Sequence, residues 1–467
     1  MAEREALANS LHIAQSHHED GIDRLFEFLR IASVSSQKER AHDCMEAAVW
    51  LLEELISIGF KGSLMETTGF PIVLAKWPST TLHAPHVLFY CHYDVQPAGP
   101  LEQWTSPPFD PHLERGSTGK EQIVARGASD DKGQLMTFIE ACRSIIHATG
   151  NLPVNLTIVA EGEEEVGSPS LSAFLSKHAS LLRSDVAFVC DGEMWDPVTP
   201  AIATSLRGIL SEEVTITGAE ADLHSGLYGG AVANPLNILS KLLASMHDGD
   251  LRVTIPGFYE QVAEPGKDRL ETWNKLEFDE DDFFAEAGRP VKFGESQRTT
   301  LERIWARPTA DIVSISGGYT AENFRTSIPS QAKAIVSFRL VGDQSPATIR
   351  QAFQNFCCSH LPVGMQVSYK SLGEAMPYAT TSGTPLFDKV ERALQDEWLK
   401  KPALIGSGGS IPAVVTFKEI LGIDALLIGF GLVDDGAHSP NEKLACENYK
   451  RGIRSWIRII MALGETA

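Results

Sequence analysis

The spacing of apolar residues changes along the chain. Near the start they recur every three to four positions, which predicts two amphipathic helices. The first set is Ile22, Leu25, Phe26 and Leu29, and the second is Met45, Val49, Leu52 and Ile56. The first sixty residues are therefore expected to be mostly helical.

Short continuous apolar runs then replace the helical spacing. They lie at Val87–Cys91, Val154–Ala160, Val186–Cys190 and Ala425–Phe430. Runs of this length predict buried strands of a largely parallel sheet, and segments such as Lys132–His147 predict helices between them. The expected fold class is α/β, with helices on both faces of a mostly parallel sheet.

The middle of the chain has a different pattern. The runs SEEVTITG, AKAIVSFRLV and MQVSYKSL alternate apolar and polar residues, and ANPLNILSKLLASMH has helical spacing. This combination predicts an antiparallel sheet with helices on one face. We expect residues 205–372 to form an inserted α+β domain, and residues 1–204 and 373–467 to form the first domain. The charged, Gly- and Pro-rich segment Pro256–Thr300 is expected to be an elaborated surface excursion.

Composition narrows the classes of function. The 40 basic and 61 acidic residues give a formal net charge of −21, which argues against nucleic acid as a partner. The seven cysteines are odd in number and form no C-x-x-C pair, so a reducing cytoplasm is expected rather than a disulfide framework. No signal peptide and no apolar stretch of roughly 20 residues is visible, so no membrane association is expected.

Polar residues cluster directly after each expected strand. They are His92 and Asp94, then Glu163 to Glu165, then Asp191, then Asp434 to His438. Ligands of open α/β sheets bind outside the carboxyl ends of the strands, so this pattern indicates a site.

Each of these groups also has a simpler interpretation. His92 and Asp94 could be a hydrogen-bonded loop pair, and Asp130 or Asp131 could cap a helix. The triple Glu could be a solvated surface run. Together, however, the groups supply two imidazoles and several carboxylates but no thiolate. This N/O set suits Zn²⁺, Mn²⁺ or Co²⁺.

The sequence resembles the co-catalytic di-zinc exopeptidases, which include carboxypeptidase G, aminoacylase and the cytosolic dipeptidases, and within them the cytosolic nonspecific dipeptidase and carnosinase branch. The resemblance covers nearly the whole chain, with its motifs in the family's order. They are CHYDVQP at Cys91–Pro97, GASDDKG at Gly127–Gly133, EGEEEVGS at Glu161–Ser168, DLHSGLYGG at Asp222–Gly230, FRTSIPSQAKA at Phe324–Ala334, SFRLV at Ser337–Val341, GSGGSIP at Gly406–Pro412 and GAHSPNEK at Gly436–Lys443.

The resemblance implies a centre of two divalent metal ions, with Zn²⁺ preferred and Mn²⁺ or Co²⁺ as alternatives. It makes the first domain catalytic and the inserted domain a lid and dimerisation domain. Asp94 would orient His92, and Asp130 would bridge both metals through a cis peptide to Asp131. The implied metal ligands are His92, Asp130, Glu165, Asp191 and His438.

The resemblance also implies the general base. The family pattern E-E-x-G-S selects Glu164 as the base and Glu165 as the ligand, leaving Glu163 as an acidic neighbour. A water bridging the two metals would lose its proton to Glu164, and the resulting hydroxide would attack the peptide carbonyl.

The remaining implied roles concern the substrate. His224 would donate to the oxyanion from the partner subunit of a homodimer. Arg339 would hold the substrate carboxylate, and Thr326 with the Gly409-Ser410 turn would bind its polar groups. The simpler alternatives are a structural histidine, a surface ion pair for Arg339 and an ordinary turn.

The expected activity is hydrolysis of dipeptides or short peptides with a free carboxylate. An N-acyl or N-carbamoyl amino acid amidohydrolase would use the same centre and is the alternative. A non-catalytic scaffold would require a broken ligand set, and a serine hydrolase would require a G-x-S-x-G elbow, which is absent.

Overall fold

The computed structural model of the chain describes residues 2–116, 119–286, 288, 290–321 and 325–465. These residues form two compact units. Unit 1 comprises residues 1–204, 380–405 and 412–467, and unit 2 comprises residues 205–379 and 406–411. Within the described part of the chain, no helix has the length and apolar character needed to cross a membrane.

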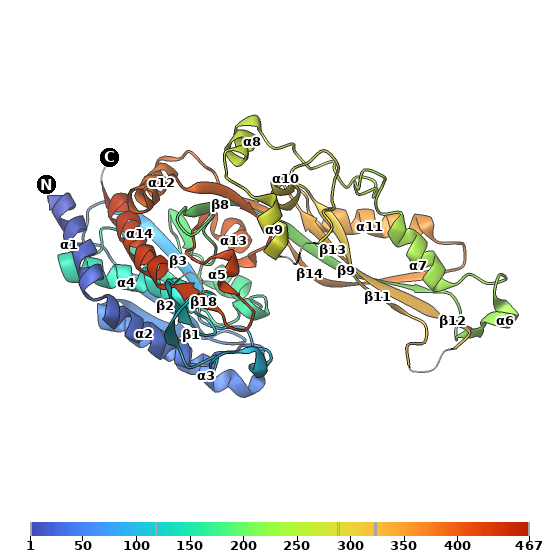
Figure 1. Cartoon of the computed structure of the whole chain (residues 1–467), viewed down its shortest axis with the longest axis horizontal. Helices are drawn as coiled ribbons and strands as arrows, with labels where there is room; N and C mark the ends of the chain where they lie inside the picture. Colours follow the sequence, from blue (N-terminus) through green and yellow to red (C-terminus); the bar gives the residue numbers. More distant parts are fainter. Residues whose placement is uncertain (1, 117–118, 287, 289, 322–324, 466–467) are drawn as a thin grey trace. The chain divides into compact units, whose positions relative to one another are not determined.

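Unit 1 is built on a mixed nine-stranded sheet whose centre is parallel (Figure 1). Of these strands, β15 and the last two residues of β8 and of β16 are grouped with unit 2. The strand order is β1-β2-β6-β3-β7-β17-β8-β15, with β16 also paired to β8. The four strands β6, β3, β7 and β17 run parallel, whereas β1, β2, β8 and β15 pair antiparallel with their neighbours. Their bounds are β1 Lys61–Met65, β2 Ile72–Trp77, β3 His86–His92, β6 Asn155–Glu161, β7 Val186–Val189, β8 Ala201–Leu206, β15 Tyr378–Ala379, β16 Ala403–Ser407 and β17 Ala425–Leu427. A second sheet has the order β18-β5-β4, from Lys443–Ala445, Glu121–Val124 and His112–Arg115.

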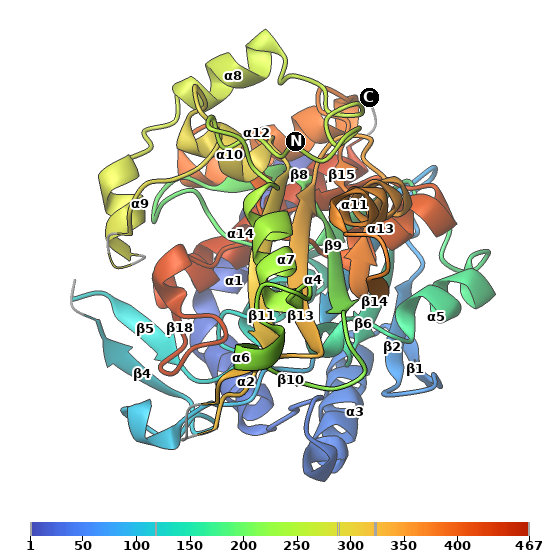
Figure 2. The same ribbon diagram turned by 90° about the vertical axis from the view of Figure 1, so that its right-hand side faces the viewer.

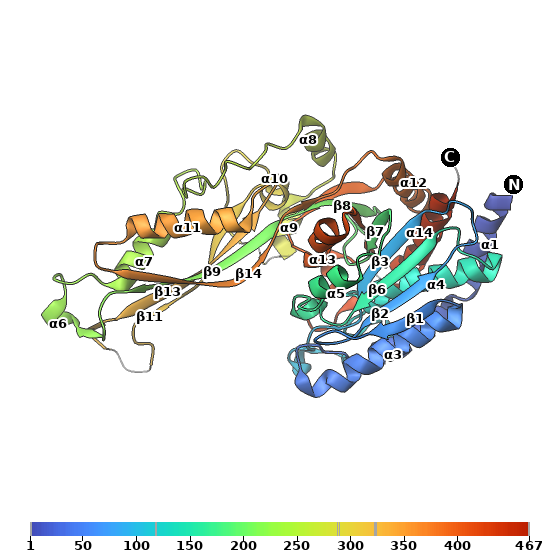
Figure 3. The same cartoon turned by 180° about the vertical axis from the view of Figure 1, so that it is seen from behind.

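Both faces of the central strands are covered, which explains their continuous apolar runs. Phe89 on β3 stacks on Phe138 of α4, whereas the next residue, Tyr90, packs edge-on against Phe417 on the opposite face. Figures 1 and 3 show helices on both sides of the sheet. The helices of unit 1 are α1 Ala2–Ser16, α2 His18–Arg30, α3 Ala41–Ile58, α4 Lys132–Thr149, α5 Leu171–His178, α12 Pro385–Trp398, α13 Pro412–Thr416 and α14 Cys446–Gly464.

The second expected helix forms as α3, but its buried face differs from the one that the large apolar residues indicated. Met45, Val49 and Ile56 are 44%, 38% and 50% exposed. The buried stripe is Cys44, Ala47, Ala48, Leu51, Leu55 and Ile58. Small residues in this stripe let the helix approach its neighbours closely. The positions of the large apolar residues alone therefore do not identify the buried face.

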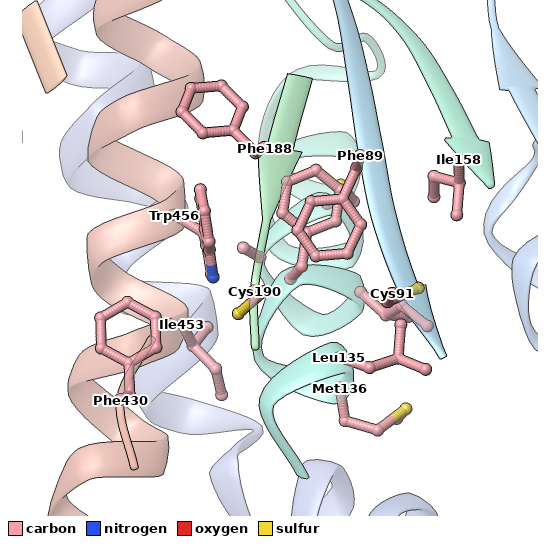
Figure 4. Packing of buried hydrophobic residues seen from close by; sticks show 14 of the residues in the cluster. Phe89, Cys91, Leu135, Met136, Ile158, Phe188, Cys190, Phe430, Ile453 and Trp456 are labelled. Carbon is pink, nitrogen blue, oxygen red and sulfur yellow. The ribbon is translucent and has the colours of Figure 1, made fainter. Parts of the chain in front are cut away.

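Trp456 of α14 is fully buried at the centre of the unit 1 core (Figure 4). Its ring packs edge-on against those of four phenylalanines, Phe89, Phe138, Phe188 and Phe430. We expect Trp456→Ala to cost about 3–5 kcal/mol of stability, because it leaves a cavity among these rings. Urea unfolding followed by circular dichroism measures the loss, and Trp456→Phe should recover part of it. A midpoint equal to the parent's for Trp456→Ala would contradict the expectation.

Unit 2 contains the expected antiparallel sheet. Its order is β11-β13-β9-β14, which Figure 2 shows from left to right. The strands are β9 Gly208–Thr217, β11 Thr309–Gly317, β13 Gln331–Leu340 and β14 Gln366–Ala375. The helices α7 Pro235–Ala244 and α11 Pro346–His360 lie along one side of this sheet (Figures 1 and 3). A short pair of strands, β10 Leu223–His224 and β12 Ser327–Ile328, lies beside α6 Ser225–Tyr228.

The segment Pro256–Thr300 is held by a buried ion-pair cluster. Arg307 donates from Nε and Nη2 to the Glu295 carboxylate at 2.7 and 2.8 Å, and Arg252 donates from Nη1 at 3.1 Å. Both guanidiniums lie over the Tyr259 ring. The segment therefore contributes to unit 2, with α8 Lys267–Asn274 and α9 Glu280–Glu286 within it and α10 Thr300–Trp305 at its end.

The unit boundaries differ from the expected domain ends in two places. Residues 373–379 group with unit 2, because β14 continues to Ala375 beside β9. Residues 406–411 also group with unit 2, because Gly406 packs against Trp305 so closely that a Cβ would lie 2.6 Å from the Trp305 Cβ. A segment of six residues is too short for hydrophobic periodicity to show which domain it joins.

Candidate functional site

The acidic and histidine residues of unit 1 gather at the carboxyl ends of its parallel strands. His92 is the last residue of β3, and Asp191 lies two residues after β7. Glu164 and Glu165 follow β6 in a short 3-10 turn, Glu164–Val166. His438 lies in the loop between β17 and β18. The strand-end pattern in the sequence thus corresponds to one cluster in space.

Two groups of three potential ligands share one residue. His92, Asp130 and Asp191 form the first group, and Asp130, Glu165 and His438 form the second. In each group the ligand atoms all lie within 4.8 Å of one another. His92 Nε2 is 3.1 Å from Asp130 Oδ1, and His438 Nε2 is 2.9 Å from Asp130 Oδ2. The two oxygens of Asp130 therefore face different histidines, as a bridging carboxylate requires.

Asp94 connects His92 to the loop that carries the two glutamates. Its backbone carbonyl oxygen accepts from His92 Nδ1 at 3.0 Å, and one of its carboxylate oxygens lies 3.4 Å from the same nitrogen. The same carboxylate accepts hydrogen bonds from the backbone N–H groups of Glu164 and Glu165 at 3.2 and 3.1 Å. Asp94 is fully buried, so these contacts fix the orientation of His92 and the position of the glutamate loop.

The loop that carries Asp130 is held by Glu442. This buried carboxylate accepts hydrogen bonds from the backbone N–H groups of Gly127, Ser129 and Asp130 at 2.8 to 2.9 Å, and it pairs with Arg126 at 2.6 Å. The Asp130-Asp131 peptide bond is cis. At Gly133 a Cβ would lie 1.9 Å from the Ala128 carbonyl oxygen, so the loop closes only around a glycine.

Burial, neighbouring charges and hydrogen bonds shift the pKa values of these groups. Burial and the carboxylates of Asp191, Glu165 and Asp130 raise the pKa of Glu164 to about 8, against the opposing charge of His92. Burial and the charge of Asp130 raise the pKa of Asp191 to about 7. Hydrogen bonds to Asp130 and Glu165 raise the pKa of His438 to about 10. A cation among these groups would stabilise the ionised carboxylates and the neutral imidazoles.

The donor set fits divalent metal ions. Glu165 Oε2 accepts from Gln96 Nε2 at 2.8 Å, whereas Glu165 Oε1 is buried with no hydrogen-bond partner among the described residues. A buried oxygen without a donor costs free energy, and a metal ion would remove that cost. Imidazole nitrogens and carboxylate oxygens are ligands that zinc accepts readily.

His224 and Thr326 lie together at one end of the unit 2 sheet. His224 pairs with Ser327 across β10 and β12, and the Thr326 carbonyl accepts from Ser225 N and Oγ at 3.0 and 2.9 Å. The exposed His224 ring accepts from Gly226 N at Nδ1, 3.0 Å away. Nε2 therefore carries the proton of the neutral ring and is available as a donor. Phe324, which opens the FRTSIPSQAKA motif, lies outside the described residues.

Arg339 and Ser410 lie together at the other end of that sheet. Arg339 Nη1 donates to Ser410 Oγ at 3.2 Å, and Gly409 is the preceding residue of the same turn. The eight steps from Gln331 to Arg339 along β13 span about 26 Å. Figure 1 shows α6 and β12, which lie beside His224, at the end of unit 2 opposite α10. Within unit 2 of one chain, His224 and Arg339 are therefore far apart.

A family model described as Peptidase family M20/M25/M40 matches residues 88–462. The chain belongs to this family. It is 30% identical over 452 residues to the Cys-Gly metallodipeptidase DUG1 of Candida albicans, covering 93% of this chain and 92% of the relative. It is 28% identical over 402 residues to the human Beta-Ala-His dipeptidase, covering 85% and 78%. The solved structure of the di-peptidase Dug1p from Saccharomyces cerevisiae superposes with a TM-score of 0.81 at 27% identity, covering 98% and 99%.

Membership in the M20 family establishes a metallopeptidase and confirms the expected fold class. Two residues of this M20 site carried no role in the sequence-based prediction. Glu442 stands within GAHSPNEK, and Gln96 within CHYDVQP, so both lie in motifs that were recognised. Their roles depend on contacts 312 and 69 residues away in sequence, to Asp130 and Glu165, which no local pattern reveals.

Proposed function

We propose that this M20 enzyme is a dipeptidase that uses two divalent metal ions, with Zn²⁺ preferred. The observation that carries the proposal is that Asp130 belongs to both ligand groups, while Glu164 lies beside them on the glutamate loop. The relatives are named as metallodipeptidases, which favours dipeptides over N-acylated amino acids as the substrate class.

The metal ions, when bound, supply Lewis acidity toward the peptide carbonyl and lower the pKa of the attacking water. His92, Asp130 and Asp191 would hold one ion, and Asp130, Glu165 and His438 the other. Asp94 keeps the His92 ring in place through its backbone carbonyl and its carboxylate. The protein thereby fixes the ligands before the substrate arrives.

Glu164 performs the proton transfers in this proposal. Its carboxylate accepts a proton from the water that attacks the carbonyl carbon, and it then donates that proton to the amine nitrogen as the C–N bond breaks. His224 donates from Nε2 to the oxygen that becomes negative during the attack. The products are two amino acids when the substrate is a dipeptide.

Arg339 would hold the substrate carboxylate, with Ser410 and Gly409 of the neighbouring turn as further polar contacts. Thr326 lies beside His224 and would, like His224, contribute from the other chain of a dimer. We expect Arg339→Met to raise KM for a dipeptide roughly 10- to 100-fold and to change kcat much less, because it removes a charge-assisted contact worth about 1.5–3 kcal/mol. Steady-state kinetics on one dipeptide measures both constants. A change confined to kcat would contradict this role.

We also propose a homodimer formed through unit 2. The strand β11 is an edge of its sheet, and Ile312, Val313 and Ile315 are 41%, 60% and 55% exposed. A long apolar edge strand favours pairing with another strand. A two-fold antiparallel pairing of two β11 strands would bring the His224 end of each sheet beside the Arg339 end of its partner. His224 would then serve the partner's site.

The seven free cysteines, six of them buried, support a reducing compartment, and we propose the cytoplasm. Fractionation of the native cells tests this, because recovery of the protein in a membrane or secreted fraction would refute it.

The proposed function is tested by metal analysis combined with a substrate panel. Protein purified without chelator should contain about two equivalents of metal per chain and hydrolyse dipeptides. N-acetyl and N-carbamoyl amino acids should be poor substrates. Removal of metal by a chelator should abolish activity, and Zn²⁺, Mn²⁺ or Co²⁺ should restore it. Activity confined to the N-acylated compounds would overturn the dipeptidase proposal.

A further inference from the structure

Arg207 lies between β8 and β9 and contacts the turn of residues 406–411. Its guanidinium donates from Nε to the Gly408 carbonyl at 3.2 Å and from Nη1 to the Arg303 carbonyl at 3.4 Å. Its backbone N–H donates to the Ser407 carbonyl at 3.2 Å. A single arginine therefore contacts the turn through both its side chain and its main chain.

Arg207 also determines the position of Ser410. The Ser410 hydroxyl donates its proton to the Arg207 carbonyl oxygen. The same hydroxyl oxygen accepts from Arg339 Nη1 at 3.2 Å. Because its proton is already committed to Arg207, the hydroxyl oxygen is oriented as an acceptor for Arg339.

The Arg207 guanidinium lies close to the backbone of the turn at Gly408. A Cβ on Gly408 would lie 3.1 Å from Arg207 Nη2 and 3.3 Å from the Ile304 carbonyl oxygen. The guanidinium thus packs directly on the backbone of the turn, and a Cβ at position 408 would push it aside by a few tenths of an ångström.

Arg207 and Arg339 form a cationic pair, and Asp311 is the acidic residue whose charge acts on both. Among the described residues, the hydrogen-bond partners of the two guanidiniums are uncharged: the Gly408 and Arg303 carbonyls and the Ser410 hydroxyl. Burial and the neighbouring charge of Arg339 lower the pKa of Arg207 to about 10, with Asp311 opposing the shift. Two partly buried cations whose charges act on each other repel, and an anion bound beside them would relieve the repulsion.

We propose that Arg207 is a positioning residue for the substrate carboxylate. It holds the turn of residues 406–411 so that Ser410 and Arg339 present a preformed anion site, and its charge adds to the attraction. This inference rests on the proposed dipeptidase function, in which Arg339 binds that carboxylate. It assigns a role to a residue outside the motifs that the sequence singled out.

The test compares one dipeptide with the same dipeptide amidated at its carboxyl end. In Arg207→Gln, KM for the free acid should rise roughly 10- to 100-fold, kcat should stay within a few-fold, and kcat/KM for the amide should be nearly unchanged. Arg269→Gln is the matched control, because Arg269 is an exposed arginine of α8 in the same unit, and its kinetics should equal the parent's.

Gly408→Ala provides a second variant, in case Arg207→Gln does not fold. It keeps both charges but shifts the guanidinium on the turn by a few tenths of an ångström, and it should show a smaller loss that is again selective for the free acid. Equal losses on acid and amide, or no loss on either, would overturn the role of Arg207. A parent enzyme that hydrolyses no dipeptide would instead refute the proposed function, so the two failures are distinguishable.

Discussion

Glu164→Gln is expected to lower kcat by a factor on the order of 100 to 10,000, because it removes the proton acceptor and donor of both steps. Glutamine has nearly the same shape as glutamate, so the backbone contact between Glu164 N and Asp94 should persist. The metal ligands are unchanged, and metal content should equal the parent's. The measurement combines steady-state kinetics with elemental analysis of the same sample.

Glu163→Gln is the matched control, since it alters the preceding carboxylate of the same run. Glu163 packs toward a different neighbour, Gly69, where a Cβ would lie 1.8 Å from Glu163 Oε1. Its kcat should remain close to the parent's. Should Glu163→Gln be inactive and Glu164→Gln active, the roles within the triple Glu would have to be exchanged.

His224→Ala is expected to lower kcat roughly 100- to 1,000-fold, the loss typical of one oxyanion donor. The decisive measurement mixes this variant with Glu164→Gln under conditions that allow subunits to exchange. In a mixed dimer, the chain with intact Glu164 would receive His224 from its partner. Random exchange should therefore restore roughly a quarter of the parental activity.

Complementation would show that the two residues act in one site from different chains. If His224 acts on the site of its own chain, the mixture stays as inactive as its components. Val313→Lys, introduced into both variants, places a charge on the exposed β11 edge and should prevent recovery. Sizing of the same samples shows whether the loss accompanies dissociation.

The sequence predicted the parallel centre of unit 1 well because its strands are buried on both faces. The run around Phe89 and Tyr90 packs against helices on each side, so burial is recorded directly as uninterrupted apolar residues. The buried face of α3 was missed for the opposite reason. There Ala47 and Ala48 occupy the interface and larger residues such as Met45 face outward.

The site was predictable as far as its residues stand within motifs. His92 and Asp191 follow the expected strands, and the structure places both beside Asp130. Arg207 and Glu442 could not be assigned because their contacts are long-range. Arg207 donates to Gly408, 201 residues away, and hydrophobic periodicity does not show that the segment around Gly408 lies beside it.

The hydrogen bonds from the Asp130 loop to Glu442 determine when the site can form during synthesis of the chain. Glu442 is 312 residues from Asp130 in sequence, and the histidine at position 438 is nearly as distant. At a synthesis rate of about 5–20 residues per second, at least fifteen seconds separate Asp130 from these residues. The two metal-ligand groups therefore cannot assemble around Asp130 until Glu442 and His438 have been synthesised.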